Sequence, residues 1–538
     1  MADGSFKDSI IVFVRWIVDY LTALYSWLFW PPITGKIPPF TERLLLKPAT
    51  EVADLIRRQE VTAEAVMKAY IKRIRDVNPL INAIIDERFR DALEDARLID
   101  RRIDEEINGN TPVEGPSILR KPLLGLPFSI KDSFAVKGMR LCAALPQRKD
   151  VRADEDSTCV INLKEAGAIP VVIGNVPEML LWWTADNNTF GRTNNPYDLN
   201  RIAGGSSGGD ASLLSAGGAV IAVGSDIGGS IRIPCCMNGV FGHKTTSGVI
   251  DAHGKYPPLP ESRMPFFTLG PMTRFASDLR VMVKAMAGEE AIKKYLPDID
   301  NNVDIGSLNI YYMLDDEDPL KTRVPVQIKE TILRVVHLLN KRFGCRVKQV
   351  TLKDFRFTTQ MFLSVMKDDS STPMIDLINE GNPDKLNVYT EFLKANIGLS
   401  KHTRHVTLFS VLQHNLPASN SKWIKDGVDM KVKLTREVQS MLGKKGVLLL
   451  PSYPGVAPTH GTTIPNNSNI GYFTALNLLE LPATQVPVGV DSKTGLPLGI
   501  QVAANRFRDV QTLAIAELLE NELGGWVPPA PFISHDSS

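Results

Sequence analysis

Four short apolar runs constrain the fold of this 538-residue chain more than any other feature. They are PFSI at 127–130, IPVVIG at 169–174, AVIAVG at 219–224 and VLLLP at 447–451. Apolar runs of this length, bounded by Gly or Pro, are typical of strands that are buried on both faces of a sheet. Stretches with helical character separate the runs, and this alternation predicts an α/β fold with a layered sheet.

Helices are predicted before the first of these runs. Thr62 can cap a helix that reaches Asn78, with Pro79 as its stop. A second, highly charged helix is expected over 87–106. No repeat, low-complexity tract or internal linker interrupts the rest of the chain, so we expect one catalytic domain over 48–530.

The N-terminal segment departs from the globular average. Residues 10–30 read IIVFVRWIVDYLTALYSWLFW, which is about the length needed to cross a bilayer core. Its charges, Arg15 and Asp19, are spaced to pair on one helical face. We predict a membrane anchor helix at 10–30, preceded by a tail at 1–9 and followed by a linker at 31–47. The polar stripe leaves open whether the helix spans the bilayer or lies in its interface, and an amphipathic helix buried in the soluble core is the alternative.

Because of this segment we expect the protein to be located at a membrane, as a single-pass or a monotopic membrane protein. Lys36, Arg43 and Lys47 follow the predicted anchor, and the positive-inside tendency then favours a cytoplasmic catalytic domain. An intracellular membrane is therefore expected.

Composition limits the partners. With 61 basic and 60 acidic residues the net charge is +1, so the electrostatic basis for a nucleic-acid partner is missing. The five cysteines include no C-x-x-C pair, which argues against a disulfide scaffold or a zinc ribbon. No metal is expected, and the oligomeric state stays open, a homodimer included.

Three motifs in the middle of the chain carry candidate chemistry. GLPFSIKDSF at 125–134 places Lys131 at the end of an apolar run, GGSSGG at 204–209 contains Ser206, and DIGGSIRIP at 226–234 contains Ser230. Two glycines before a serine allow consecutive backbone N–H groups to converge on one point, as an oxyanion hole requires. A serine beside such donors needs a base, and a lysine can serve if its pKa falls by about three units.

In this order the three motifs resemble the amidase signature family of Ser-Ser-Lys hydrolases. FGRTNNPYD at 190–198, LPATQVPVG at 481–489 and GLPLGIQVAA at 495–504 extend the resemblance over about residues 48–525. The resemblance implies the amidase-signature fold, a large mixed sheet covered by helices. It also implies that Ser230 is the nucleophile, that Ser206 is a bridging serine in a cis peptide, and that Lys131 is the base. No cofactor is implied.

Further roles follow only from the resemblance. The backbone N–H groups of Ile227, Gly228, Gly229 and Ser230 match the oxyanion hole. Side chains that hold the triad and its loop are matched by Ser207, Asp226 and Arg232. One departure is FGHKTT at 241–246, where relatives commonly have Lys-Pro-Thr.

The predicted anchor selects a branch of this family. Bacterial amidases are soluble, whereas fatty-acid amide hydrolases carry such a helix, and the chain resembles those of type 2, which have a single N-terminal anchor. NVPEMLLWW at 175–183 resembles the stretch that lines their acyl pocket, with Leu180 as the best single match. The implied substrates are lipid amides, namely primary amides and N-acylethanolamines, cleaved to fatty acid and amine through an acyl-enzyme on Ser230.

Three alternatives remain open. The chain could be an amidase for another class of amides. Ser206 also satisfies G-x-S-x-G, the nucleophile elbow of α/β-hydrolase esterases and lipases, although the preceding residues 194–203 are turn-rich and polar. A membrane-tethered binding protein without activity is the third alternative, and the presence of Lys131, Ser206 and Ser230 argues against it.

Overall fold

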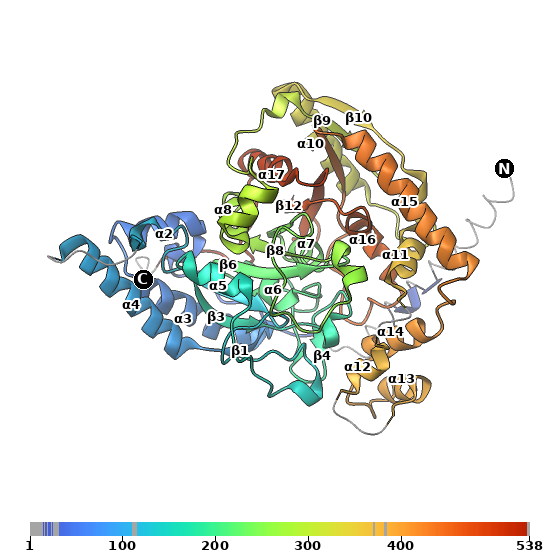
Figure 1. Cartoon of the computed structure of the whole chain (residues 1–538), viewed down its shortest axis with the longest axis horizontal. Helices are drawn as coiled ribbons and strands as arrows, with labels where there is room; N and C mark the ends of the chain where they lie inside the picture. The colour runs from blue at the N-terminus through green and yellow to red at the C-terminus, as the bar shows by residue number, and fades with distance from the viewer. Residues whose placement is uncertain are drawn as a thin grey trace.

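The structure is a computed structural model that describes residues 14, 17, 18, 20–22, 24, 32–109, 116–368, 372–380 and 385–534. Within these ranges eleven strands form one mixed sheet (Figure 1). In sheet order they are β1 (Ile84–Glu87), β3 (Ile169–Gly174), β2 (Pro127–Lys131), β6 (Ile221–Asp226), β8 (Thr268–Thr273), β7 (Phe241–Lys244), β12 (Ala483–Val490), β13 (Pro497–Ala504), β11 (Gly446–Pro451), β9 (Asn309–Tyr312) and β10 (Arg346–Gln349). A separate ribbon pairs β4 (Asp186–Asn187) with β5 (Gly191–Arg192).

The sheet mixes parallel and antiparallel pairs. β2 lies parallel to β3 and β6, and β9 lies parallel to β10 and β11, while the strands between these groups pair antiparallel. Every residue of β2, β3, β6 and β11 is buried, so both faces of the sheet are covered there. These are the four strands predicted from the apolar runs, and the prediction of an α/β fold with a large mixed sheet is confirmed.

Helices surround the sheet (Figure 1). α8 packs on β8, α17 packs on β12, and α7 contacts β7 and β13. The described helices are α2 (Ala49–Arg57), α3 (Ala63–Ile81), α4 (Phe89–Asn108), α5 (Thr158–Glu165), α6 (Gly208–Ser215), α7 (Arg232–Asn238), α8 (Ala276–Ala287), α9 (Glu289–Tyr295), α10 (Val326–Phe343), α11 (Thr358–Met366), α12 (Met374–Ile378), α13 (Val388–Asn396), α14 (Arg404–His414), α15 (Lys422–Leu442), α16 (Gly471–Leu478) and α17 (Asp509–Leu523).

The predicted helix that begins at Thr62 is longer than expected. The Thr62 side chain accepts a hydrogen bond from the backbone N–H of Ala65, as an N-cap does, and the helix is α3. It continues through Pro79 and ends where Asn82 adopts the left-handed conformation with φ 46°. Pro79 lies inside the last turn of the helix, so it does not mark the stop. The predicted charged helix is α4, two residues downstream of the expected bounds.

The segment predicted as a linker, residues 31–47, is largely packed against the domain. Phe40 is fully buried, and its backbone N–H donates to the carbonyl of Pro531 at 2.8 Å. The Arg73 guanidinium lies over the Phe40 ring and donates to the carbonyls of Pro38 and Pro39. From about residue 37 onward the segment predicted as a linker therefore packs into the domain, because its apolar side chains belong to the core.

The predicted anchor at 10–30 lies mostly outside the described residues. Among the helices that the structure describes, none is both long and apolar enough to cross a bilayer. The described helical residues of this segment expose apolar side chains: Val14, Ile17, Val18, Tyr20, Leu21 and Leu24 are between 36% and 62% exposed.

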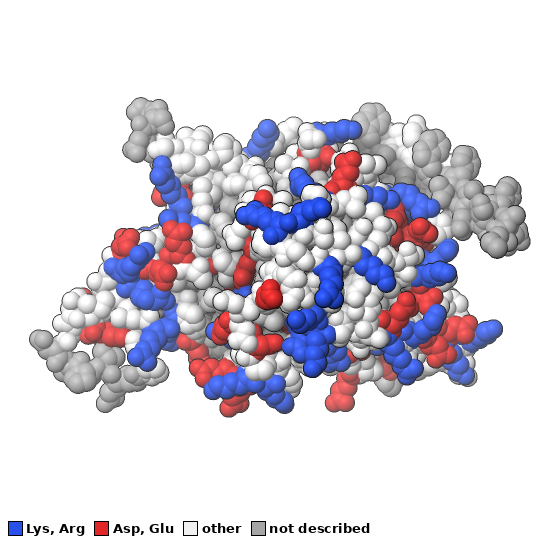
Figure 2. All heavy atoms as spheres, turned by 90° about the horizontal axis from the view of Figure 1, so that it is seen from above, with Lys and Arg blue, Asp and Glu red and all other residues white. Residues whose placement is uncertain are grey.

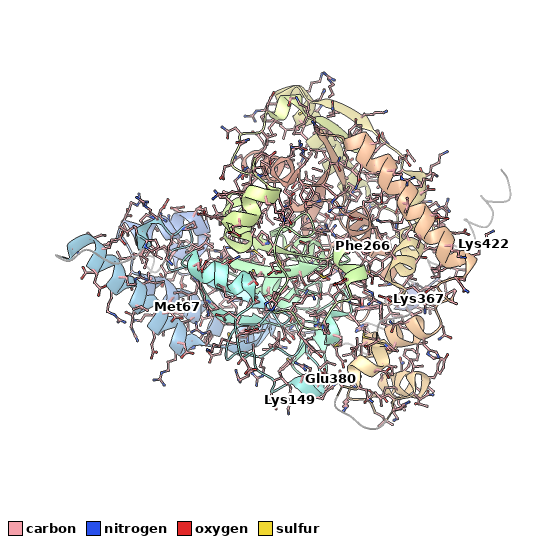
Figure 3. All side chains as sticks on the ribbon, viewed as in Figure 1. Met67, Lys149, Phe266, Lys367, Glu380 and Lys422 are labelled. Carbon is pink, nitrogen blue, oxygen red and sulfur yellow. The ribbon has the colours of Figure 1, made fainter. Side chains whose placement is uncertain are left out.

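A helical cap formed by α12, α13 and α14 lies beside the sheet. It has a small apolar core of its own, in which Met374, Ile378 and Val406 pack against Leu145 and Met179. Figure 3 shows Glu380, just after α12, close to the segment that carries Lys149. The cap therefore contacts the loops that follow the central strands, where the candidate site lies.

Charges of both signs mix on the face of the molecule that is shown in Figure 2. Figure 2 shows acidic and basic side chains interspersed over one face of the molecule, with wide uncharged areas between them. This is the pattern that the nearly equal numbers of acidic and basic residues lead us to expect.

Candidate active site

Lys131, the last residue of β2, is buried with 1% of its surface exposed. Its Nζ atom donates to Ser206 Oγ at 2.7 Å and to Ser225 Oγ at 2.9 Å. Burial lowers the pKa of Lys131 from 10.5 to about 7, against the opposing effect of the carboxylates of Asp210 and Asp226. A large share of this amine is then neutral at pH 7, and the neutral amine is the form that can accept a proton.

Ser206 lies in the irregular loop before α6. The Gly205–Ser206 peptide bond is cis, as the family resemblance implies. Position 205 needs glycine because a Cβ there would lie 2.8 Å from the backbone N of Thr184. Residues 193–205, all of them described, contain isolated bridges but no strand. A nucleophile elbow requires a strand directly before the serine, so the α/β-hydrolase alternative is wrong.

Ser230 lies in the turn that links β6 to α7, and its carbonyl accepts a hydrogen bond from the N–H of Ser207 at 3.2 Å. This bond ties the turn to the Ser206 loop. Lys131, Ser206 and Ser230 line one cavity. The structure therefore brings the three predicted catalytic side chains together from three separate segments of the chain.

The backbone of the turn differs in one respect from the expected oxyanion hole. The Gly229 N–H donates to the Asp226 carboxylate at 2.7 Å, so this group already has a partner. Among the described residues, no hydrogen bond occupies the N–H groups of Ile227, Gly228 and Ser230. Three of the four predicted donors are thus available to an oxyanion, and Gly229 helps to hold the turn instead.

Asp226 and Arg232 hold the turn that carries Ser230 in place through hydrogen bonds. The Arg232 guanidinium donates to the Asp226 carboxylate at 3.0 and 3.1 Å, and both side chains are fully buried. Although burial alone would raise the pKa of Asp226, the charge of Arg232 and the hydrogen bonds hold it well below its usual range. Arg232 also donates to Gln501 and Asn477, each at 2.6 Å. Ser207 contributes through its backbone, since its Oγ has no partner among the described atoms.

Two further residues around Lys131 were not identified from the sequence. Ser225 accepts a hydrogen bond from Lys131, and it lies near the carboxyl end of β6, which is parallel to β2. Asp210, at the start of α6, accepts a hydrogen bond from Ser129, and burial raises its pKa to about 7. Polar residues at the ends of adjacent parallel strands were the signal that could have revealed Ser225.

The cavity itself is mostly apolar. Its volume is about 200 Å³. Leu180 lines it together with Met179 and Leu181, so the predicted pocket residue lies in the cavity. Side chains from α11 and from the helical cap form much of the remaining wall: Phe362, Leu363, Met366, Met374, Leu377, Phe409, Leu412 and Leu416.

Comparison with known proteins identifies the class. The Amidase family model matches residues 65–513, most of the chain. The chain therefore belongs to the amidase signature family, and it is a serine hydrolase that acts on amides.

The chain is similar over most of its length to individual members of the family. The chain is 39% identical over 509 residues to human Fatty-acid amide hydrolase 2. This match covers 93% of the present chain and 94% of the human protein. It is also 39% identical over 501 residues to Fatty-acid amide hydrolase 2-A of Danio rerio, covering 92% of each. A solved structure of a fatty acid amide hydrolase superposes with a TM-score of 0.71 at 22% identity, over 95% of this chain and 89% of that one, and so supports the fold.

Proposed function

We propose that this protein hydrolyses long-chain fatty-acid amides, primary amides and N-acylethanolamines, to a free fatty acid and an amine. The observation that carries the proposal is that a Lys-Ser-Ser cluster opens into a cavity whose walls are mostly apolar. Each CH₂ group of an acyl chain that is buried contributes about 0.8 kcal/mol of favourable binding free energy. Apolar walls therefore favour amides with long acyl chains over short polar amides. The similarity to fatty-acid amide hydrolases supports the same conclusion.

The reaction proceeds in two halves. Neutral Lys131 takes a proton from Ser206, which takes one from Ser230, and Ser230 Oγ attacks the amide carbon. The N–H groups of Ile227, Gly228 and Ser230 stabilise the charge that develops on the carbonyl oxygen. The proton returns through Ser206 to the amide nitrogen, the C–N bond breaks, and the amine leaves. A water molecule then attacks the acyl-enzyme by the same relay and releases the fatty acid.

Membrane attachment through residues 10–30 belongs to the same proposal. The exposed apolar side chains of Val14, Ile17 and Leu21 support it, because such side chains gain free energy in a bilayer interface. An attached enzyme would receive its lipid substrate from an intracellular membrane rather than from dilute solution.

A panel of amides on detergent-purified protein tests the substrate assignment. Oleamide and N-oleoylethanolamine should be hydrolysed with higher kcat/KM than a short aryl amide, and a fluorophosphonate should label Ser230. Preference for the short aryl amide would instead favour an amidase of another substrate class. Absence of both labelling and turnover would favour a binding protein.

A further inference from the structure

A buried carboxylate that the proposed reaction does not use lies next to the base. Asp210, in the first turn of α6, is fully buried. Its carboxylate lies against Gly174, because a Cβ at that position would overlap the carboxylate oxygens. Gly174 stands opposite Lys131 in the parallel pairing of β3 with β2, and neighbouring strands are about 4.8 Å apart. Asp210 is therefore placed beside the end of β2 that carries the base.

Ser129 fixes the face of the sheet on which this carboxylate lies. Ser129 precedes Lys131 by two residues in β2, and side chains two residues apart along a strand point to the same face. The Ser129 hydroxyl donates a hydrogen bond to Asp210 Oδ1. The other carboxylate oxygen, Oδ2, has no hydrogen-bond partner among the described atoms. The carboxylate of Asp210 therefore lies on the face of the sheet that carries the base.

The amine of Lys131 is held by serine oxygens rather than by a carboxylate. Its Nζ lies 2.7 Å from Ser206 Oγ, 2.9 Å from Ser225 Oγ and 3.3 Å from the Ser225 carbonyl oxygen. A neutral amine can donate two hydrogen bonds to Ser225 and accept one from Ser206, whereas an ammonium group can donate all three. Because these contacts suit both forms, burial and nearby charges decide which form prevails.

Burial and charge act on Lys131 in opposite directions. Burial lowers its pKa to about 7, and the carboxylate of Asp210 opposes this shift more strongly than that of Asp226 does. Burial also raises the pKa of Asp210 to about 7, against the hydrogen bond from Ser129 and the charge of Lys131. The two groups thus titrate in the same range of pH, and each favours the charged form of the other.

The two other acids near the base have strong partners of their own. The Asp226 carboxylate accepts from the Arg232 guanidinium at 3.0 and 3.1 Å. Asp132, which follows the base in the chain, accepts from the backbone N–H groups of Cys142 and Ala144 at 2.8 and 2.9 Å. These contacts compensate both charges, so the charge of Asp210 has the largest effect on the base.

The other elements packed against α6 hold their charged groups away from this pair. β3 and β8 contain no titratable residue. In α7, burial raises the pKa of Cys235 well above 9, so this thiol is neutral. Arg73 of α3 donates to the carbonyl of Ala216, at the opposite end of α6 from Asp210. In β1, Asp86 pairs with Arg140.

We infer that Asp210 is a positioning residue for the reaction, whose negative charge keeps buried Lys131 basic enough to take the proton from Ser206. This inference rests on the proposed relay. Burial alone would make the amine a weaker base, and an acid bound tightly to it would hold it as an ammonium group. A carboxylate that acts on Lys131 without a direct hydrogen bond raises its basicity and still leaves much of it neutral at pH 7.

Removal of this charge at constant size tests the inference. The pH dependence of kcat/KM for oleamide, and that of the rate of fluorophosphonate labelling, are measured for the wild type, Asp210→Asn and Ser129→Ala. We expect Asp210→Asn to move the acid limb of both profiles to lower pH by about one unit or more, because an opposite charge at short range shifts a pKa by such an amount. The plateau should fall severalfold, since a weaker base accepts the proton less readily. Ser129→Ala should cause a smaller shift in the same direction, because it removes a hydrogen bond that favours the charged carboxylate.

Asp278→Asn is the matched control. Asp278 of α8 is also buried, and it accepts hydrogen bonds from the backbone N–H groups of Ala49 and Thr50 at 2.8 and 3.0 Å. This variant should have a lower melting temperature, but its acid limb should lie at the same pH as that of the wild type. A merely structural role of Asp210 would make Asp210→Asn behave in the same way.

Each outcome bears on one of the two proposals. An acid limb that Asp210→Asn leaves in place or moves to higher pH refutes the role of Asp210, while the proposed function stands. If the wild type is labelled but does not hydrolyse oleamide, the substrate assignment fails, and the labelling profile alone then tests Asp210. If Asp210→Asn does not fold, Ser129→Ala decides, and an unchanged acid limb in that variant refutes the inference.

Discussion

The imidazole Nδ1 of His402 lies 2.6 Å from a carboxylate oxygen of Glu178, and both side chains are buried. The second carboxylate oxygen of Glu178 accepts from the backbone N–H of Thr403 at 2.7 Å, directly before α14. Glu178 thereby joins the helical cap to the loop of Met179 and Leu180, where the backbone has φ values of 56° and 61°. Residues other than glycine rarely adopt such backbone φ values, so contacts from the surrounding structure must hold the loop in this conformation. The Glu178–His402 contact is one of them.

Loss of the Glu178–His402 contact should loosen the cavity wall. We expect Glu178→Ala to lower the free energy of unfolding by about 1–3 kcal/mol, because it leaves buried donors without an acceptor. The KM for oleamide should rise several-fold while kcat changes little, since Lys131 and the serines do not touch this pair. Glu178→Gln keeps an acceptor oxygen and should restore much of both losses. A variant that lost kcat with an unchanged KM would place the effect at the triad instead.

Removal of the proposed nucleophile should abolish turnover. Ser230→Ala deletes the attacking oxygen and leaves the N–H donors in place, so kcat should fall on the order of 10⁴-fold or more. Covalent labelling by a fluorophosphonate should disappear, as peptide mapping of the labelled wild type would verify. Ser206→Ala is the matched control, since it interrupts the proton relay but retains the nucleophile. Labelling that survived Ser230→Ala and vanished in Ser206→Ala would reverse the two roles.

The pH dependence should follow the unusual pKa of Lys131. Protonation removes the base, so kcat/KM should rise with pH through about 7 and level off above it. Lys131→Met should cost about 10³-fold in kcat and abolish this dependence. A profile that Lys131→Met left unchanged would mean that another group is the base.

Lys131→Met should also stabilise the fold, and the gain should depend on pH. Unfolded lysine keeps its proton up to about pH 10.5, whereas the folded chain releases it near 7. Wild-type stability is therefore lowered fully below pH 7, and this loss diminishes as the pH rises to 10.5. The melting temperature of Lys131→Met should exceed that of the wild type most clearly at or below pH 7. An equal difference at pH 7 and at pH 10 would contradict the shifted pKa.

The strands that could be predicted from the sequence are those whose burial requires a continuous run of apolar residues. β3 and β11 are covered on both faces, so nearly every residue is apolar and the run is visible in the sequence. β7 is equally buried but contains His243 and Lys244, which read locally as polar. His243 Nδ1 lies 2.9 Å from Thr484 Oγ1, 241 residues away along the chain, and no local pattern indicates such a partner.

The candidate site residues also divide into those marked by a local sequence motif, which could be predicted, and those defined by long-range contacts, which were missed. Lys131, Ser206 and Ser230 lie in distinctive motifs, so the sequence alone could predict that they belong to one site, and the structure places them around one cavity. Glu178 and His402 are 224 residues apart, and no local pattern in the sequence indicates that they meet. Ser225 resembles any other serine until the parallel pairing of β6 with β2, which brings it to Lys131, is known. The roles of these residues depend on long-range packing, which a single sequence does not contain.

The N-terminal segment should divide into a part needed for membrane binding and a part needed for the fold. Deletion of residues 1–31 retains the hydrogen bonds between Ile33 and Asn200 and the burial of Phe40. That variant should fold, hydrolyse a short soluble amide normally, and bind liposomes less, so its long-chain to short-chain activity ratio in liposomes should fall. Deletion of residues 1–47 removes Phe40 as well, which should cost about 3–5 kcal/mol and lower the melting temperature. If the shorter deletion still sedimented with liposomes and kept its activity ratio, the membrane contact would lie elsewhere. The exposed side chains of Leu412 on α14, which also lines the cavity, and of Trp423 on α15 would then be the next to test.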